Sequence, residues 1–175
     1  MSAEVRPARL DDAAAIGRVH VETWQACYRG QMPDEILDSL SVTQRAEQWQ
    51  RRLAAEPQVG AVFVAETGAE IVGFASCAPA EGENSLEGAG ELQAIYLHPD
   101  QWGFGIGRRL LEVTEARLRD DGYGRAMLWV LGANERARRF YETAGWTCDG
   151  TEQMYHRDGH DIPEVRYERD LRPGD

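Results

Sequence analysis

The chain has 175 residues, carries a net charge of −11, and takes all of its basic side chains from arginine. This length predicts one domain over residues 1–175, and the acidic balance excludes nucleic acid as an expected partner, because binding to a phosphate backbone depends on Lys and Arg. No apolar run approaches the ~20 residues of a membrane span, the first residues lack a signal-peptide pattern, and the three scattered cysteines indicate no disulfide framework and no metal site, so we expect a cytoplasmic protein without a membrane partner.

The first half of the chain predicts helices that precede a β-hairpin. Apolar and small residues repeat at helical spacing after Asp12, and Ser41 followed by Gln44 is a capping-box pattern. Two Val- and Phe-rich runs separated by a glycine turn are typical of a hairpin. We expect, in order, a strand at 5–8, a helix at 12–27, a helical turn at 34–40, a helix after Ser41, and an antiparallel pair of strands at 60–66 and 70–78.

A strand at 91–97 is followed by a glycine-rich turn that opens a helix ending near Asp121. Glycine lets a backbone adopt conformations closed to residues with a Cβ, and we expect this at Gly103, Gly105 and Gly107. The first N–H groups of a helix lack intrahelical partners and carry partial positive charge. The turn and the helix after it therefore match a diphosphate.

Two common nucleotide-binding motifs are excluded. A P-loop requires lysine, and the chain has none. A dinucleotide fingerprint requires G-x-G-x-x-G and an acidic residue about twenty positions later, whereas this spacing is G-x-G-x-G and the next strand, at 126–131, is entirely hydrophobic. A nicotinamide cofactor is not expected.

A short helix and two strands complete the chain. Asn134 is a good helix N-cap, Phe140 and Tyr141 follow on the helix, and Gly145 stands where a left-handed C-cap belongs. We expect the last strands near 147–154 and 164–171, with His156 and His160 flanking a turn rather than binding a metal.

Two blocks of residues together resemble the Gcn5-related N-acetyltransferase superfamily. The blocks are Leu97-x-Pro99-x-x-x-Gly103-x-Gly105-Ile106-Gly107-Arg108-x-Leu110-Leu111 and Asn134-x-x-Ala137-x-x-Phe140-Tyr141-x-x-x-Gly145-Trp146. One departure is Trp102, where the family usually has Gln or Arg. The resemblance implies an α/β fold with a mixed, mostly antiparallel central sheet of six to seven strands, of which the fourth and fifth splay apart, flanked by about four helices.

The resemblance also implies acetyl-CoA as co-substrate and direct transfer of its acetyl group to a primary amine of a small molecule or peptide. The residues that it assigns to acetyl-CoA are Ile95, Tyr96, Leu97, Gly103, Phe104, Gly105, Ile106, Gly107, Arg108, Asn134 and Tyr141. A backbone N–H near Leu97, freed by a bulge, would donate to the oxyanion.

Two residues are candidates for proton transfer. Tyr141 matches the family's usual acid for the departing thiolate, and the alternative is that it packs in the core. Glu91 stands where some relatives place a base that works through water, and the alternative is a solvated charge at a strand edge. A carboxylate serves as this base only if burial raises its pKa. Glu22, His20 and His98 are lesser candidates.

The acceptor is left open by the sequence. Glu22, Trp24 and Tyr28 fall in the region that gives this family its substrate specificity, and the aromatic pair either cradles a cation or packs in the core. A homodimer is the commonest assembly of soluble proteins and is kept as an alternative to a monomer. The rival function is a non-catalytic acyl-CoA sensor or interaction module on the same fold.

Overall fold

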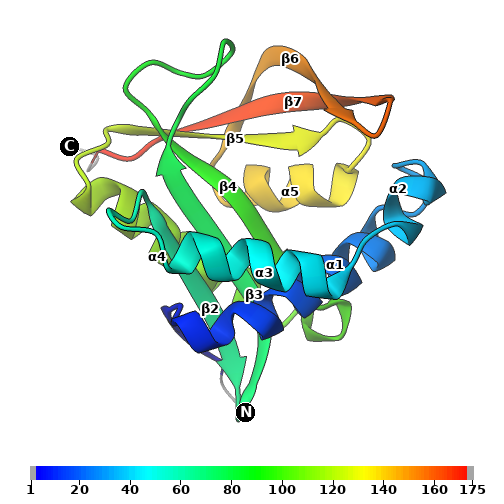
Figure 1. The fold of residues 1–175 in the computed structure, drawn as a ribbon. Helices are drawn as coiled ribbons and strands as arrows, with labels where there is room; N and C mark the ends of the chain where they lie inside the picture. Colours follow the sequence, from blue (N-terminus) through cyan, green and yellow to red (C-terminus); the bar gives the residue numbers. More distant parts are fainter. Residues whose placement is uncertain (1–2, 173–175) are drawn as a thin grey trace.

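The computed structural model describes residues 3–172 and has a seven-stranded sheet at its centre (Figure 1). The spatial order is β1-β2-β3-β4-β5-β7-β6, and all neighbours are antiparallel except β4 and β5. The mixed, mostly antiparallel sheet confirms the predicted fold class. The strands are β1 (Glu4–Pro7), β2 (Ala61–Thr67), β3 (Glu70–Pro79), β4 (Gly90–Leu97), β5 (Arg125–Leu131), β6 (Thr147–Arg157) and β7 (His160–Asp170).

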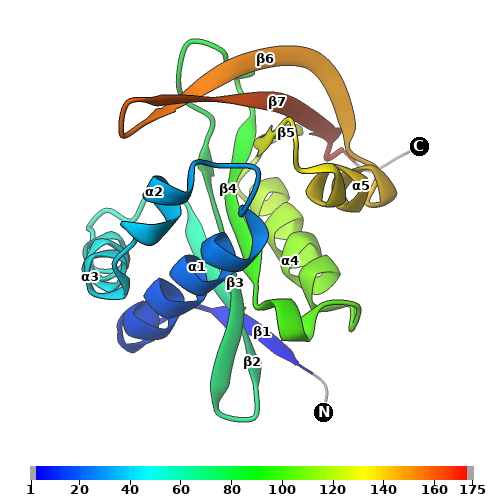
Figure 2. The same cartoon turned by 90° about the vertical axis from the view of Figure 1, so that its right-hand side faces the viewer.

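Helices cover both faces of the sheet, as Figure 2 shows, with α1 and α3 on one side and α4 and α5 on the other. There are five α-helices among the described residues rather than about four, because the segment expected as a helical turn forms α2. Two short 3-10 helices, η1 (Leu10–Asp12) and η2 (Pro99–Gln101), precede α1 and α4. The α-helices are α1 (Ala13–Cys27), α2 (Asp34–Asp38), α3 (Val42–Leu53), α4 (Ile106–Asp120) and α5 (Glu135–Thr143).

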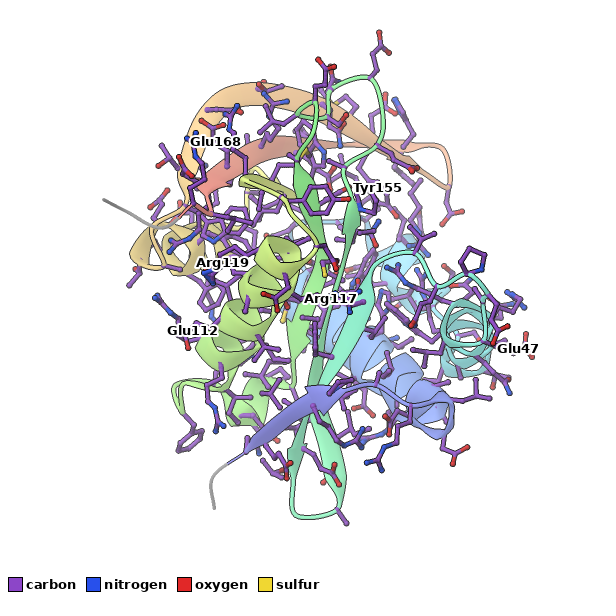
Figure 3. All side chains as sticks on the ribbon, turned by 90° about the vertical axis from the view of Figure 1, so that its left-hand side faces the viewer. Glu47, Glu112, Arg117, Arg119, Tyr155 and Glu168 are labelled. Atoms are coloured by element: carbon purple, nitrogen blue, oxygen red, sulfur yellow. The ribbon has the colours of Figure 1, made fainter. Side chains whose placement is uncertain are left out.

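The core consists of separate hydrophobic clusters on the two faces. Ile16 of α1 and Trp49 of α3 pack on Val64 and Phe74 of the sheet, whereas α4 and α5 pack on the opposite face. Nearly every residue of β3 is consequently buried, as expected for a strand covered on both sides. Glu47, Glu112 and Arg119 are exposed and lie on the outer surfaces of the helices (Figure 3).

The two final strands are longer than the sequence predicts and form one hairpin. Asp158 and Gly159, both with positive φ, make its turn. Most side chains of β6 alternate between exposed and half-buried, so no apolar run marks where the strand ends. His156 and His160 lie on either side of this turn as expected, and His156 contacts Asp161 across it.

The sheet opens between β4 and β5. Their parallel ladder contains only Gly90 opposite Ala126 and Glu91 opposite Met127, and β5 pairs along its whole length with β7 instead. From Leu92 onward β4 therefore has a paired edge toward β3 and an unpaired edge toward β5. This splay confirms the predicted separation of the fourth and fifth strands. None of the described helices is long and apolar enough to cross a membrane.

Candidate active site

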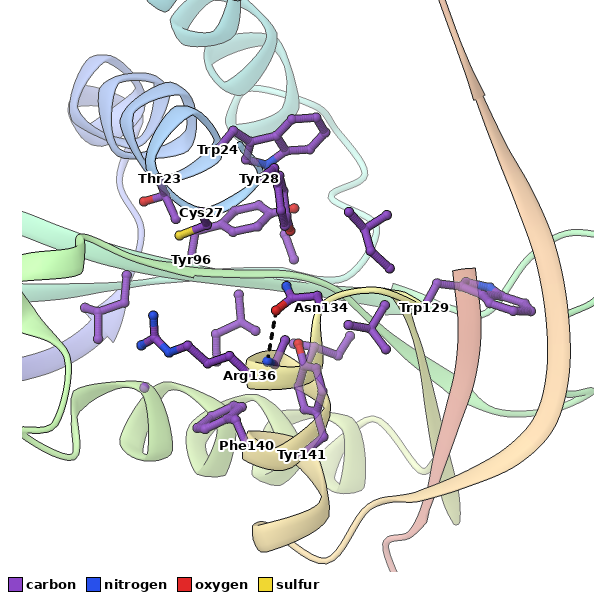
Figure 4. Close-up of a pocket in the computed structure, with 18 of the residues that line it drawn as sticks. Thr23, Trp24, Cys27, Tyr28, Tyr96, Trp129, Asn134, Arg136, Phe140 and Tyr141 are labelled. Carbon is purple, nitrogen blue, oxygen red and sulfur yellow. Dashed lines mark hydrogen bonds between the residues drawn. The ribbon is translucent and has the colours of Figure 1, made fainter. Parts of the chain in front are cut away.

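A cavity of about 1210 Å³ runs through the opening between β4 and β5. Figure 4 shows how its walls meet, with Trp24 of α1 and the C-cap Tyr28 on one side and Asn134, Phe140 and Tyr141 on the other. Side chains of α3, of β4 and of the β6–β7 hairpin complete the lining. The cavity thus connects the two faces of the sheet at the position where the strands separate.

The free edge of β4 presents backbone donors to this cavity. Hydrogen-bonded and non-hydrogen-bonded pairs alternate along an antiparallel ladder. His98 donates its N–H to the Val72 carbonyl at 2.8 Å, so Leu97 opposite Gly73 and Ile95 opposite Ala75 are non-hydrogen-bonded pairs. The N–H groups of Leu97 and Ile95 therefore point away from β3 and toward β5.

The bulge expected in this strand is present, but it lies four residues before Leu97. The β3–β4 register changes between Ser76 opposite Ala94 and Cys77 opposite Leu92, which places the extra residue at Gln93. The sequence-based reason for a free N–H near Leu97 was therefore wrong. The N–H is directed into the cavity because the ladder alternates and β5 diverges.

The N-terminus of α4 lies at one end of the cavity. Gly103 and Gly105 have φ of +82° and +77°, and Gly105 is the N-cap. The first intrahelical bond runs from the Arg109 N–H to the Gly105 carbonyl at 3.1 Å, so the N–H groups of Ile106, Gly107 and Arg108 have no intrahelical acceptor. The turn thus presents free N–H groups at the start of a helix, and its residues line the cavity with the exception of Phe104.

Gly107 and Phe104 differ from the expectation. Gly107 is inside α4 without a positive φ, so its backbone is open to other residues, and a Cβ there would lie 3.6 Å from the Phe140 ring. That distance is an ordinary van der Waals contact, so neither the backbone conformation nor the packing against α5 requires glycine at this position. Phe104 is 75% exposed and does not line the cavity.

Trp102, the departure from the family pattern, joins the two sides of the opening. Its indole Nε1 donates to the Leu97 carbonyl at 2.9 Å, and the Arg136 guanidinium of α5 stacks on its ring. Arg108, Arg136 and Arg139 line this end of the cavity. The positive charge of these arginines adds to that of the α4 N-terminus.

Asn134 and Tyr141 hold α5 and its side chains in place. The Asn134 side chain accepts a hydrogen bond from the Ala137 N–H at 3.1 Å, which confirms it as the N-cap. Tyr141 is 7% exposed, lines the cavity and also contacts the rings of Trp146 and Tyr167. Its pKa is raised above the ordinary range, first by burial and then by Tyr96, so the hydroxyl stays protonated. Packing and the proposed role as an acid are compatible.

Glu91 shares the cavity with a second carboxylate, Glu164 of β7. The pKa of Glu91 is raised to about 7, first by burial and then by the carboxylates of Glu164 and Glu81, and Arg52 opposes the rise. Burial also raises the pKa of Glu164, whose Oε2 accepts from Gln153 Nε2 at 3.0 Å. Glu91 is half-buried rather than a fully solvated strand-edge charge, and it has the basicity that proton abstraction near neutral pH requires.

The lesser candidates for a base have other surroundings. His20 lines the cavity, but burial followed by the charges of Arg45 and Arg157 lowers its pKa to about 3. Its Nδ1 accepts from Trp49 Nε1 at 3.2 Å, so the ring is a neutral, fixed part of the wall. His98 and Glu22 approach each other at 3.8 Å outside the cavity. His98 caps η2, as expected for a turn residue.

The acceptor side of the cavity is aromatic. Trp24 and Tyr28 both line it, with ring centroids 5.3 Å apart, and Tyr96 lies 6.2 Å from Trp24. Trp24 also belongs to a buried cluster with Ile36 and Leu37, so it contributes to the core as well as to the wall. Glu22, placed by the sequence in the same substrate region, is not part of this lining.

Several residues of the cavity were not found from the sequence. Glu164, Arg45 and Arg52 all line it. Glu164 lies more than seventy positions after Glu91 and meets it only because β7 pairs beside β5. The arginines of α3 are part of a strongly charged helix, in which nothing local distinguishes a residue facing the cavity from one facing solvent.

A glycine-capped helix and two diverging strands thus enclose the large cavity. Comparison with known proteins shows which class of protein has this arrangement. Residues 21–146 match the Acetyltransferase (GNAT) family. The chain is 35% identical over 132 residues to YuaI, an uncharacterized N-acetyltransferase of Bacillus subtilis, covering 74% of this chain and 72% of that protein. It is 35% identical over 96 residues to a mycothiol acetyltransferase of Thermobispora bispora, covering 54% of this chain and 32% of that protein.

Solved structures share the fold at lower identity. A GCN5-related N-acetyltransferase of Rhodopseudomonas palustris superposes with a TM-score of 0.77 at 18% identity, covering 97% of this chain and 96% of that one. An acetyltransferase of Salmonella typhimurium, solved with its cofactor acetyl-CoA, gives a TM-score of 0.73 at 20% identity, covering 100% and 97%. The chain belongs to the acetyltransferase (GNAT) family. As a member it is an acyltransferase whose co-substrate is acetyl-CoA.

Proposed function

We propose that the protein transfers the acetyl group of acetyl-CoA directly to a primary amine held on the α1–α3 side of the cavity. The observation that carries the proposal is the continuity of the cavity. It runs from the N-terminus of α4, through the opening between β4 and β5, to the carboxylates of Glu91 and Glu164.

The cofactor half of the proposal rests on backbone groups. The diphosphate is bound by the N–H groups that follow Gly103 and Gly105, where the helix dipole and Arg108 supply positive charge. The pantetheine arm extends along the free edge of β4, and the N–H groups of Ile95 and Leu97 face it. Charge that develops on the thioester oxygen is stabilised by such fixed donors.

The transfer step requires three proton movements. Glu91 accepts a proton from the ammonium form of the acceptor, directly or through water, and leaves the nitrogen lone pair free to attack the carbonyl carbon. The C–N bond forms, the tetrahedral oxyanion collapses, and the C–S bond breaks. The departing thiolate takes a proton from the Tyr141 hydroxyl, and the tyrosinate is reprotonated by the second proton that the attacking nitrogen loses as the amide forms. Glu164 contributes by raising the pKa of Glu91.

The test combines acetyl-CoA with a panel of amines and follows the release of free thiol, together with the mass of the product. We expect amine-dependent thiol release from the wild-type protein and an acceptor heavier by one acetyl group. Binding of acetyl-CoA without turnover of any amine in a wide panel would instead support the non-catalytic sensor. Thiol release that does not depend on an amine would indicate hydrolysis and contradict acetyl transfer.

A further inference from the structure

Two arginines flank Trp24 at the acceptor end of the cavity. The guanidinium carbon of Arg45 lies 5.6 Å from the Trp24 ring centroid, and that of Arg157 lies 5.1 Å from it. Arg45 comes from α3 and Arg157 from the end of β6, so the fold brings together like charges from two distant segments. Burial and the charge of Arg157 both lower the pKa of Arg45, and Tyr155 and Tyr96 oppose this shift.

The counter-charges near this pair are weak. Arg45 donates to the amide oxygen of Gln48 at 2.8 Å and makes no ion pair with a described carboxylate. Arg157 contacts Asp158 at 3.3 Å, but that carboxylate is exposed and adjacent in sequence. Exposed ion pairs contribute little. The two guanidinium groups therefore retain much of their capacity to bind an anion.

A second, smaller cavity lies at the same place. Its volume is about 190 Å³, several times the ~30 Å³ that one water occupies. Arg45 and Tyr155 line both this cavity and the large one, so the two adjoin. Its lining is mostly polar and includes no carboxylate: Ser39, Leu40, Ser41, Gln44, Arg45, Gln48, Tyr155 and Arg157.

The hairpin connects this small cavity with the carboxylates. One face of β6 carries every second residue of the strand, namely Gln153, Tyr155 and Arg157. Gln153 is directly opposite Glu164 of β7. Arg157 is four residues beyond Gln153, a distance of about 13 Å along an extended strand. One wall of the two adjoining cavities thus has an acidic end, at Glu91 and Glu164, and a basic end, at Arg45 and Arg157.

We infer that the acceptor is an amine that also carries an anionic group, a carboxylate or a phosphate, which Arg45 and Arg157 bind in the small cavity. Its ammonium group is directed to Glu91 and Glu164, and its apolar part contacts Trp24. The length of the wall favours several bonds between the two charged ends. This inference rests on the proposed function for the role of the amine, whereas the anion site itself does not depend on catalysis.

The anion site is tested by titrating the protein and recording the indole N–H signals of its tryptophans by NMR, with and without coenzyme A. Trp24→Phe assigns the Trp24 signal. Inorganic phosphate, O-phosphoethanolamine and glycylglycine are the anionic ligands, and ethanolamine and glycylglycinamide are their neutral-ended counterparts. We expect a saturable shift of the Trp24 signal with the anionic ligands, and at least tenfold weaker binding of the counterparts. The stronger of the phosphate and carboxylate ligands identifies the anion.

Matched variants locate the site. Arg45→Gln and Arg157→Gln should each weaken binding about tenfold or more, Arg45→Lys should weaken it less, and Arg51→Gln, an exposed arginine of the same helix, should leave it unchanged. Circular dichroism confirms that each variant is folded. No saturable shift with any anionic ligand, or equal binding by wild type and Arg45→Gln, would overturn the inference. If no anion binds but acetyl-CoA does, the anion site is contradicted and the proposed function is not. If an anion binds but acetyl-CoA does not, the proposed function is contradicted and the anion site is not.

Discussion

At the scale of single residues, the proposed role of Glu91 as the base makes its pKa the property that determines the pH at which the amine is activated. The pKa of its carboxyl group is raised to about 7 in the folded protein, so the basic carboxylate is present above that pH and is lost below it. We predict that kcat/KM rises with pH through about 7, and that Glu91→Gln removes this rise and lowers kcat by about 100-fold. Thiol release measured across this range provides the profile. If kcat/KM of Glu91→Gln rises with pH by the same amount, the rise reflects deprotonation of the acceptor amine itself. That result would contradict the role of Glu91.

Two neighbours of Glu91 should shift this profile in opposite directions. Glu164→Gln removes a like charge, lowers the pKa of Glu91 and moves the rise to lower pH. Arg52→Gln removes a positive charge and moves it to higher pH. The pH profile of kcat/KM checks both. A merely structural effect would reduce the rate at every pH without moving the midpoint, and shifts of the same sign in both variants would contradict the electrostatic explanation.

Tyr141 can be tested by removal of one atom. Tyr141→Phe keeps the ring against Trp146 and removes the hydroxyl, so we predict a decrease in kcat of about 10- to 100-fold with little change in the binding of acetyl-CoA. Steady-state kinetics and calorimetry measure the two quantities.

The matched control for Tyr141 is Tyr167→Phe. The Tyr167 hydroxyl accepts from Arg138 at 3.1 Å and donates to Glu142 at 2.6 Å outside the cavity. Its removal should cost about 1 kcal/mol of unfolding free energy and leave kcat unchanged. Equal kcat values for Tyr141→Phe and wild type would show that Tyr141 only packs.

At the scale of elements, the turn before α4 has a conformation that only glycine adopts without strain. Gly105 has a φ of +77° and open space where a Cβ would lie, so Gly105→Ala strains the backbone without a clash. We predict a loss of about 1 kcal/mol in unfolding free energy and at least tenfold weaker binding of acetyl-CoA, because the first N–H groups of the helix are displaced. Thermal unfolding and calorimetry measure these.

Gly68 provides the control for this strain. It has a φ of +66° and equally open surroundings, in the β2–β3 turn away from the cavity. Gly68→Ala should lose comparable stability and bind acetyl-CoA as the wild type does. Equal weakening of acetyl-CoA binding by both substitutions would indicate a general loss of stability rather than a local anion site.

Elements with local signals could be predicted closely from the sequence. The Asn134 cap, the Gly145 C-cap and the glycine turn before α4 are set by residues within a few positions of each other. The ends of β6 and β7 could not be predicted in this way, because the side chains of β6 alternate between exposed and half-buried and only Ile162 and Tyr167 are buried in β7. The position of the bulge, at Gln93, also could not be predicted, since it is a property of two paired strands.

At the scale of the whole molecule, the site depends on contacts between distant parts of the chain. The motif residues of β4, α4 and α5 indicated the cofactor side of the cavity because the resemblance covers them. Glu164, Arg45 and Arg157 could not be placed from the sequence, because only the pairing of β7 beside β5 and the packing of α3 bring them to the cavity or beside it. We could therefore propose a chemistry for the acceptor only from the three-dimensional structure.

The central claim is that the opening of the sheet binds the coenzyme, and a crystal structure with saturating acetyl-CoA tests it most directly. We predict a diphosphate within hydrogen-bond distance of the N–H groups that begin α4, and a thioester between β4 and β5 near Leu97 and Tyr141. A coenzyme seated anywhere else on the protein, or the absence of any coenzyme in crystals soaked at saturation, would contradict it.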